Sequence, residues 1–547
     1  MNVWLPLYTF WAGDIHPMPD GRFFMYCCNC QGFNIIKLFF IGSCILLITT
    51  CGTEQSESRE TMYETPPTEP FIERAAEPPI TTPLNLSVPG AGFDFDDPPT
   101  PNFREVSVHD PSIFRVGDMF YIIGSHMSSA RTTDFIYWEQ VSSYVSPDNP
   151  LMYSIEDFQE AFDWARTDTF WAGDVQPMPD GRFFMYYCNC EGSMPLGNIG
   201  LAIADHPEGP YMNQGIFLRS GMHGISEDGT PYNANIHPNA VDPHAFFDSN
   251  GEFWMVYGSF SGGIFILRMC PETGFPLPDQ GYGTRLMGNN HSRIEGPYIL
   301  FSPETEYYYL FVTFGGLGRN DGYNMRVARS RRPDGPFYDN RGNAMIDVHG
   351  ARGSFFDDRA IEPYGTKLMG GYWFLREQGE RRMTTGYLSP GHNSAYFDAE
   401  TGRYFLIFHT RFVVGHHHQV RVHEMFLTDC GWFVVSPFRF DGAPQRSFSP
   451  AHVPGSWKLI NHGQDINYEA NLSVTVNLTA DGIVYGAKNG YWSLEEDGIT
   501  LNITVDGEAF RGRLLRGYAS DHNQWVMSFT VMSEMGVALW GAGVALG

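Results

Sequence analysis

Short apolar runs separated by turn signals dominate the middle of the chain. The runs are rich in aromatic and branched side chains, which favour strands over helices. They occupy residues 119–125, 182–188, 252–258, 306–312 and 403–409. Four of the five follow a turn signal such as Pro-Asp-Gly, and most are followed by a second run of alternating apolar and polar residues. Repeated strand modules with no amphipathic helix between them predict a five-bladed β-propeller, whereas a β-sandwich would need no fivefold theme.

The repeated theme ends near residue 445, and a different pattern follows. Residues 450–547 contain alternating runs broken by Ala-Asp-Gly, Glu-Asp-Gly and Val-Asp-Gly turns. This pattern predicts a small C-terminal β-sandwich or β-barrel. We therefore expect an all-β protein with a propeller at 106–445 and a C-terminal β-domain at 450–547. The role of the second domain is left open between structural support and glycan contact.

The N-terminal residues repeat part of the second module. Residues 9–30 match residues 169–190 except at three positions, Ile15/Val175, His16/Gln176 and Cys27/Tyr187. A copied strand pair detached from its neighbours cannot bury its own apolar face. We interpret residues 1–33 as an artefact or a partial duplication and expect no function from them.

Residues 34–51 have the pattern of an export signal. Lys37 precedes an apolar run that is about a dozen residues long and too short to span a membrane comfortably. The run ends at Cys51-Gly52, which resembles a bacterial lipoprotein signal with lipidation at Cys51. An ordinary secretory signal is the alternative. Residues 52–105 are rich in Glu, Pro, Thr and Ser, a composition that predicts a flexible linker.

The net charge of −27 argues against a nucleic-acid partner, because phosphate binding needs a basic face. An acidic surface suits solubility outside the cell. It does not by itself select a ligand.

Three acids stand at similar places in three modules. They are Asp110 in SVHDPSIF, Asp242 in NAVDPHAFFD and Glu295 in SRIEGPYILF. The first strands of successive propeller blades line the central channel, so acids at their starts converge on one site. Asp before Pro is also a common turn former, and these residues alone leave catalysis and blade geometry as equal alternatives.

Eight motifs in this order resemble family 43 glycoside hydrolases, in particular endo-α-1,5-L-arabinanases with a C-terminal β-domain. They are VHDPSI, FWAGD, NAVDPHAFFD, YGSFSGGIF, RIEGPYI, YNMRVARS, SPGHNSAYFD and HQVRVHEMF. The resemblance is strong over residues 105–445 and looser over the tail.

The resemblance implies an inverting hydrolase in which Asp110 is the general base and Glu295 the general acid. Asp242 would orient the acid and raise its pKa, since a nearby carboxylate opposes ionisation. An inverting enzyme needs its two reacting carboxyls about 6.5–9.5 Å apart to admit a water. His392 matches a histidine beside a Ca²⁺ ion. The expected substrate contacts are His109, Trp171, Asn239, Ala240, Ser259 and Phe260.

The expected substrate is plant cell-wall arabinan or its oligosaccharides, and the expected protein is a secreted monomer attached to the membrane only through a lipid at Cys51. Two alternatives stay open. One is an exo-acting α-L-arabinofuranosidase or β-xylosidase of the same fold. The other is a non-catalytic glycan-binding propeller, which would be expected to have lost at least one of the three acids.

Overall fold

The computed structural model describes residues 86–382, 384–415 and 417–546, together with four two-residue strands nearer the N-terminus. The chain divides into two compact units, residues 1–75 and 76–547. In the first unit, two antiparallel pairs are formed by β1 (His16–Pro17) with β2 (Phe23–Phe24) and by β3 (Phe40–Ile41) with β4 (Cys44–Ile45). The predictions of a duplicated segment, an export signal and a lipidated Cys51 lie outside the described side chains. None of the described helices is both long and apolar enough to cross a membrane.

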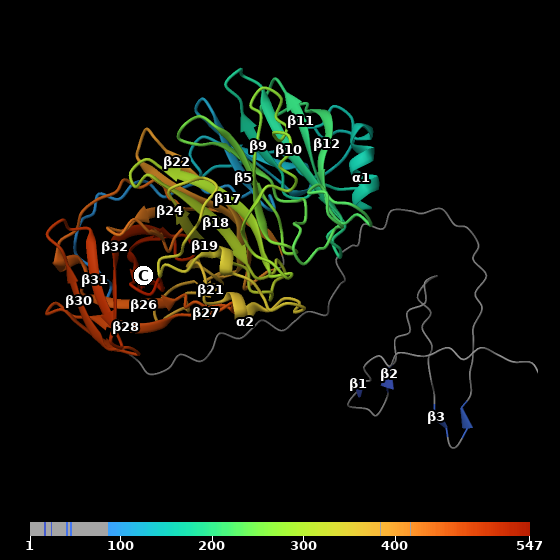
Figure 1. Cartoon of the computed structure of the whole chain (residues 1–547). Helices are drawn as coiled ribbons and strands as arrows, with labels where there is room; N and C mark the ends of the chain where they lie inside the picture. Colours follow the sequence, from blue (N-terminus) through green and yellow to red (C-terminus); the bar gives the residue numbers. More distant parts are fainter. Residues whose placement is uncertain are drawn as a thin grey trace, which may run out of the picture. The chain divides into compact units, whose positions relative to one another are not determined.

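The second unit contains the predicted five-bladed propeller (Figure 1). The first blade contains β5 (Ser112–Val116), β6 (Met119–Gly124), β7 (Ser128–Thr132) and β8 (Glu139–Ser142). The second contains β9 (Asp174–Pro177), β10 (Phe183–Cys190), β11 (Gly197–Ala204) and β12 (Met212–Arg219). The third contains β13 (His244–Phe247), β14 (Phe253–Tyr257), β15 (Ile264–Arg268) and β16 (Thr284–Met287).

The fourth blade has four strands and the fifth has six. The fourth contains β17 (Ile294–Ser302), β18 (Tyr307–Phe314), β19 (Asn324–Ser330) and β20 (Thr366–Met369). The fifth contains β22 (Tyr387–Asp398), β23 (Arg403–Phe412), β24 (His418–Leu427) and β25 (Phe433–Val435), extended by β21 (Tyr372–Trp373) and β27 (Asn471–Leu472). Two short helices, α1 (Gln159–Ala165) and α2 (Asp358–Ile361), lie in the connections.

The apolar runs recognised in the sequence are the second strands of the blades, not the first. Each of β6, β10, β14, β18 and β23 is almost completely buried. A strand that has a neighbouring strand on each side and a packed blade on each face is buried all round, so its sequence is a continuous apolar run. The innermost strands are less conspicuous in the sequence because their starts face the channel and carry polar residues.

Apolar packing between the first and last blades closes the ring. Ile113 and Phe120 of the first blade share a core cluster with Phe405 and Ile407 of the fifth. Equivalent clusters fill the gaps between the other neighbouring blades. The closed ring brings the starts of all five inner strands to one channel.

The C-terminal domain is a closed eight-stranded barrel, which confirms the predicted all-β module (Figure 1). Its strands are β26 (Gly455–Asn461), β28 (Val474–Leu478), β29 (Ile483–Gly486), β30 (Gly490–Leu494), β31 (Thr500–Val505), β32 (Glu508–Ala519), β33 (Gln524–Ser533) and β34 (Ala538–Gly543). Trp457, Met527 and Phe529 are fully buried in its interior. Closure leaves no exposed strand edge.

The range predicted for the flexible linker, residues 52–105, extends too far toward the C-terminus. Phe95 packs against the barrel core, Asp97 forms an ion pair with Arg516 at 2.5 Å, and the Trp525 indole N–H donates to the carbonyl of Pro98 at 3.1 Å. The average composition of residues 52–105 conceals these few anchoring side chains. The segment from residue 86 is therefore ordered against the barrel, and residues 52–85 lie outside the described range.

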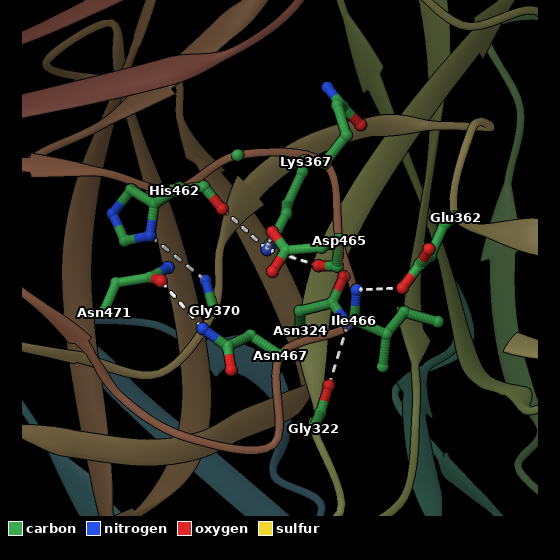
Figure 2. Close-up of polar contacts among 12 residues, drawn as sticks. Gly322, Asn324, Glu362, Lys367, Gly370, His462, Asp465, Ile466, Asn467 and Asn471 are labelled. Atoms are coloured by element: carbon green, nitrogen blue, oxygen red, sulfur yellow. Dashed lines mark hydrogen bonds and ion pairs between the residues drawn. The ribbon is translucent and has the colours of Figure 1, made fainter. Parts of the chain in front are cut away.

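A loop of the barrel domain is inserted beside the fourth blade (Figure 2). The buried ammonium of Lys367 donates to the carbonyls of His462 and Asp465, both at 2.7 Å. Burial, helped by the charge of Arg326, lowers the pKa of Lys367 to about 7. The Ile466 N–H also donates to the Glu362 carboxylate at 2.9 Å. These contacts satisfy buried polar groups on both sides and join the two domains.

Candidate active site

The three predicted acids meet in one cleft. Asp110 lies two residues before β5, Asp242 two residues before β13, and Glu295 is the second residue of β17. With His392 of β22 they line a cavity of about 270 Å³. The propeller thus brings together side chains from four blades that are distant in sequence.

Asp110 and Asp242 have the same unusual backbone conformation. Both have φ of 55°, in the left-handed region that non-glycine residues seldom adopt, although aspartate tolerates it better than most. Both are buried, with 5% and 7% of their surface exposed. Backbone strain of this kind persists only where the surrounding structure enforces it, and it is concentrated at functional sites.

Histidines surround the Asp110 carboxylate. His109 Nδ1 lies 2.7 Å from Oδ2, His392 Nδ1 lies 3.1 Å from Oδ1, and the Ser125 hydroxyl donates to Oδ2. Burial alone raises the pKa of Asp110, but the charges and hydrogen bonds of His109 and His392 lower it well below its usual value. Asp110 is therefore held as a carboxylate.

A third histidine supports this arrangement from behind. The Asp110 N–H donates to His409 Nδ1 at 3.1 Å, and the His409 ring stacks on that of His109 with centroids 3.8 Å apart. Burial and the charge of His109 lower the pKa of His409 well below its usual value. Because Nδ1 accepts, the neutral ring carries its hydrogen on Nε2. That atom is buried without a hydrogen-bond partner among the described residues.

Glu295 has the opposite electrostatic environment. Its Oε2 accepts from the Ser259 hydroxyl at 2.7 Å, and its Oε1 accepts from the Tyr323 hydroxyl. Burial and the negative charge of Asp242 raise the pKa of Glu295 to about 8, against the opposing charge of His392. Glu295 is therefore protonated at neutral pH.

The pKa of Asp242 lies between those of Asp110 and Glu295. Burial raises its pKa to about 6, with His392 lowering it and Asp110 raising it. Its Oδ2 accepts from the Gly296 N–H at 3.2 Å, which ties it to the strand that carries the acid. Asp242 and Glu295 thus share one electrostatic environment, in which the negative charge of Asp242 opposes ionisation of Glu295.

Gly296, the residue directly after the acid Glu295, must be glycine. Its φ is +59°, and an added Cβ would lie 2.9 Å from the His392 ring. Only glycine allows the imidazole to lie against the strand that carries Glu295. Burial lowers the pKa of His392, but Asp110 and Asp242 raise it to about 10, so that the imidazole is positively charged between them.

The second blade has an acid with a different role. Asp174, from the FWAGD motif, is 2% exposed. Its Oδ1 accepts from the Ser112 hydroxyl at 2.5 Å, and its Oδ2 accepts from the Ala245 N–H at 2.8 Å. Asp174 therefore links three blades through its hydrogen bonds.

Most of the predicted substrate contacts line the cleft. His109, Trp171, Asn239, Ser259 and Phe260 are among its lining residues. The Trp171 indole N–H donates to the Cys190 carbonyl at 2.8 Å, which fixes the ring at the edge of the cleft.

Ala240, in contrast, does not line the cleft. It is fully buried in the core between the second and third blades, and its N–H donates to the Ser220 hydroxyl at 2.9 Å. The predicted direct contact of Ala240 with substrate is therefore wrong, because its neighbour Asn239 faces the cleft while its own methyl group packs inward.

Sequence reasoning missed the residues that hold the acids in place. Ser125 and Tyr323 lie 15 and 28 residues from the carboxyl groups to which they donate, and His409 lies 299 residues from the Asp110 N–H from which it accepts. His409 ends a recognised apolar run and Tyr323 is the first residue of the YNMRVARS motif, but neither position carries a local signal for its partner. The cleft also contains His291, Phe355 and Phe356, which no motif indicated.

The arrangement can perform general acid–base hydrolysis. It offers an ionised carboxylate to activate water and a protonated carboxyl to donate to a leaving group, both buried within one open cleft. The opposite protonation states follow from the histidines around Asp110 and the neighbouring carboxyl beside Glu295.

Comparison with known proteins agrees with this chemistry. The profile "Glycosyl hydrolases family 43" matches residues 102–358, and the profile "C-terminal lipocalin-like domain" matches residues 437–541. The chain is 51% identical over 444 residues to extracellular endo-α-(1→5)-L-arabinanase 2 of Bacillus subtilis, covering 81% of this chain and 94% of that protein. It is 45% identical over 451 residues to the extracellular endo-α-(1→5)-L-arabinanase of Thermotoga petrophila, with the same coverage of both chains, 81% and 94%.

Solved structures extend the likeness over both domains. A family 43 glycoside hydrolase of Bacillus licheniformis aligns with a TM-score of 0.78 at 51% identity, covering 81% of this chain and 99% of that one. The endo-1,5-α-L-arabinanase of Thermotoga petrophila aligns with a TM-score of 0.77 at 44% identity, again covering 81% and 99%. The chain belongs to glycoside hydrolase family 43.

Proposed function

We propose that this enzyme hydrolyses internal α-1,5-L-arabinofuranosidic bonds of plant cell-wall arabinan. The observation that carries the proposal is the pairing of a buried carboxylate, Asp110, with a buried protonated carboxyl, Glu295, in one open cleft. Two relatives that match over most of their length are endo-arabinanases, which selects the substrate class.

The proposed reaction is a single displacement with inversion. Glu295 donates its proton to the glycosidic oxygen as the bond to the anomeric carbon breaks. Asp110 accepts a proton from the water that attacks that carbon from the opposite face. Asp242 supports Glu295 by keeping its carboxyl protonated before donation. Trp171 offers an aromatic face to the apolar side of a furanose ring.

We also propose that His392 holds a Ca²⁺ ion with waters. The residues present fit a cation once His392 is neutral, because the ionised Asp110 and Asp242 place negative charge around its ring and the ion would take the place of the proton that the imidazole otherwise carries. Calcium prefers oxygen ligands, so a single imidazole requires several waters in the shell. The ion would supply positive charge to the cleft.

For its location, we propose a secreted monomer that is held at the cell surface by a lipid on Cys51. The extracellular relatives support export. The apolar run that ends at Cys51-Gly52 supports lipidation. The lipid would be the only attachment to the membrane.

Glu295→Gln and Asp110→Asn should each lower kcat on linear arabinan by at least about 100-fold, because each removes a proton-transfer group. Exposed Glu304→Gln and Asp118→Asn are the matched controls and should retain wild-type rates. Circular dichroism should be unchanged in all four variants. Early products of the wild-type enzyme should be mixed oligomers. Substantial turnover by either cleft variant would refute the assigned roles, and arabinose as the sole early product would refute endo cleavage.

The rate should fall as pH rises through about 8, because Glu295 must be protonated to donate and its pKa is raised to about 8. Asp242→Asn removes a negative charge next to the acid, so it should lower the pKa of Glu295 and move the alkaline limb of kcat/KM to lower pH. A limb that stays in place, or moves to higher pH, in the Asp242→Asn profile would contradict this coupling.

Elemental analysis of the purified wild-type enzyme should find calcium, and chelation should reduce both activity and Tm. His392→Ala should lose the bound calcium, whereas His417→Ala, at an exposed histidine, should retain it. Equal calcium content in the two variants would count against the site.

Cys51→Ser should abolish incorporation of labelled fatty acid and release the enzyme into the medium, because the lipid would be its only attachment to the membrane. Cys44→Ser, within the apolar run, is the matched control. Mass spectrometry that finds an unmodified Cys51 in the cell-associated natural protein would rule out the anchor.

A further inference from the structure

One side of the cleft carries aromatic rings that the proposed proton transfers do not use. His291, Phe355 and Phe356 line the cleft near the fourth blade, and we call these three residues the aromatic wall. Phe355 is 65% exposed and Phe356 is 46% exposed. Two adjacent phenylalanines that are left uncovered at the edge of an active site indicate a binding surface.

The rings of the wall form a continuous row. His291 stacks on Phe355 with centroids 4.4 Å apart and planes 24° apart, and Phe355 contacts Phe356 at 4.8 Å. Phe356 meets Phe260 edge-on at 5.5 Å. Phe260 follows Ser259, whose hydroxyl donates to Glu295. The row therefore runs outward from the neighbourhood of the acid.

Polar contacts hold the loop that carries the two phenylalanines. The Asn290 amide donates to the Gly350 carbonyl at 3.0 Å, and the Gly350 N–H donates to the Ser292 hydroxyl at 2.8 Å. At the other end, Arg293 Nε donates to Asp358 Oδ1 at 3.0 Å. The wall is thus tied to the strand that carries Glu295 and is prearranged for binding.

Tyr468, from the inserted loop of the barrel domain, completes this tether. Its hydroxyl donates to Asp358 Oδ2 at 2.5 Å and accepts from Arg293 at 3.1 Å. The charges of Arg293 and Asp358 are paired with each other, which leaves the exposed rings as the binding surface of this loop.

The backbone at the wall is in a conformation that side chains disfavour. His291 and Phe356 both have φ of 56°, and Phe260 has φ of 47°. Bulky residues with positive φ are uncommon, and such strain persists at ligand clamps where the surroundings enforce it.

The chemistry of the wall selects a neutral ligand with an apolar face. Burial lowers the pKa of His291, so its ring is uncharged at neutral pH. A furanose ring presents C–H groups on one face and hydroxyls at its edge, which suits stacking on an aromatic surface. Trp171 and Met194 line the same cleft, on the second blade, so that apolar surface is offered by two different blades.

We propose that the aromatic wall is a glycan-binding subsite for an arabinofuranosyl unit of a long chain, away from the bond that is cleaved. This inference rests on the proposed arabinanase function. The wall increases the affinity for polymeric substrate and leaves the proton transfers unchanged.

The test compares long and short substrates. Phe355→Ala combined with Phe356→Ala should raise KM on linear arabinan about tenfold, which corresponds to about 1.4 kcal/mol, with little change in kcat. KM on the shortest arabino-oligosaccharide that the enzyme cleaves should stay at the wild-type value, because a short substrate does not reach the wall. Phe355→Tyr keeps the ring and should behave as wild type.

Tyr491→Ala is the matched control, since Tyr491 is 70% exposed on β30 of the barrel and does not line the cleft. It should leave both KM values unchanged. An unchanged polymer KM in the double variant would overturn the inference, and so would an equal rise on both substrates, which would place the effect on the central site.

A binding measurement separates this inference from the proposed function. If the wild-type enzyme does not cleave linear arabinan, the proposed function fails. Calorimetry of arabinan binding in the Glu295→Gln background, with and without the two phenylalanine substitutions, then still tests the wall. Weaker binding on removal of the rings supports the wall as a glycan subsite, and unchanged or undetectable binding overturns it.

Discussion

Three carboxyl groups buried in one channel cannot all ionise without compensation, and the site is organised around this electrostatic constraint. Desolvation opposes the charge of each carboxyl, and each ionised group opposes the others. The positive charge of His392 lies against Asp110 and Asp242 and lowers the pKa of both. His109 adds a hydrogen-bond partner to Asp110, whereas it acts on Asp242 only through its charge. The negative charge therefore concentrates on Asp110, and the proton is retained at Glu295.

The rest of the fold maintains this distribution of charge. Packing between the first and fifth blades closes the ring and brings together β5, β13, β17 and β22, which position the four groups. Asp174 joins three blades through hydrogen bonds to Ser112 and Ala245. Gly296 allows His392 to approach the strand of the acid. Each of these features is structural, and each helps to hold the carboxyl groups in their positions.

The barrel domain is joined to the catalytic domain through buried polar contacts. Lys367 of the fourth blade binds two carbonyls of the inserted loop, and Tyr468 of the same loop reaches the ion pair of Arg293 and Asp358. Arg293 is two residues before Glu295, and Asp358 follows the exposed phenylalanines. The loop therefore lies next to both the strand of the acid and one wall of the cleft.

The sequence by itself determined the fold class and the three acids. The second strands are buried on both faces and read as apolar runs, and the motifs around Asp110, Asp242 and Glu295 are local. Composition misplaced the end of the linker, because Phe95 and Asp97 are anchored by barrel residues more than 350 positions away. Ala240 was assigned to the cleft because a motif does not show which side chains face inward.

The resemblance assigned different roles to the three acids, but only the tertiary structure shows why their pKa values differ. Asp110 and Asp242 both precede proline and have the same φ, yet their pKa values move in opposite directions because different histidines and carboxyls surround them. The aromatic wall likewise exists only once the loop at Phe355 and Phe356 is folded against His291. Electrostatics and surface shape depend on distances between residues that are remote in sequence, and a sequence pattern does not contain those distances.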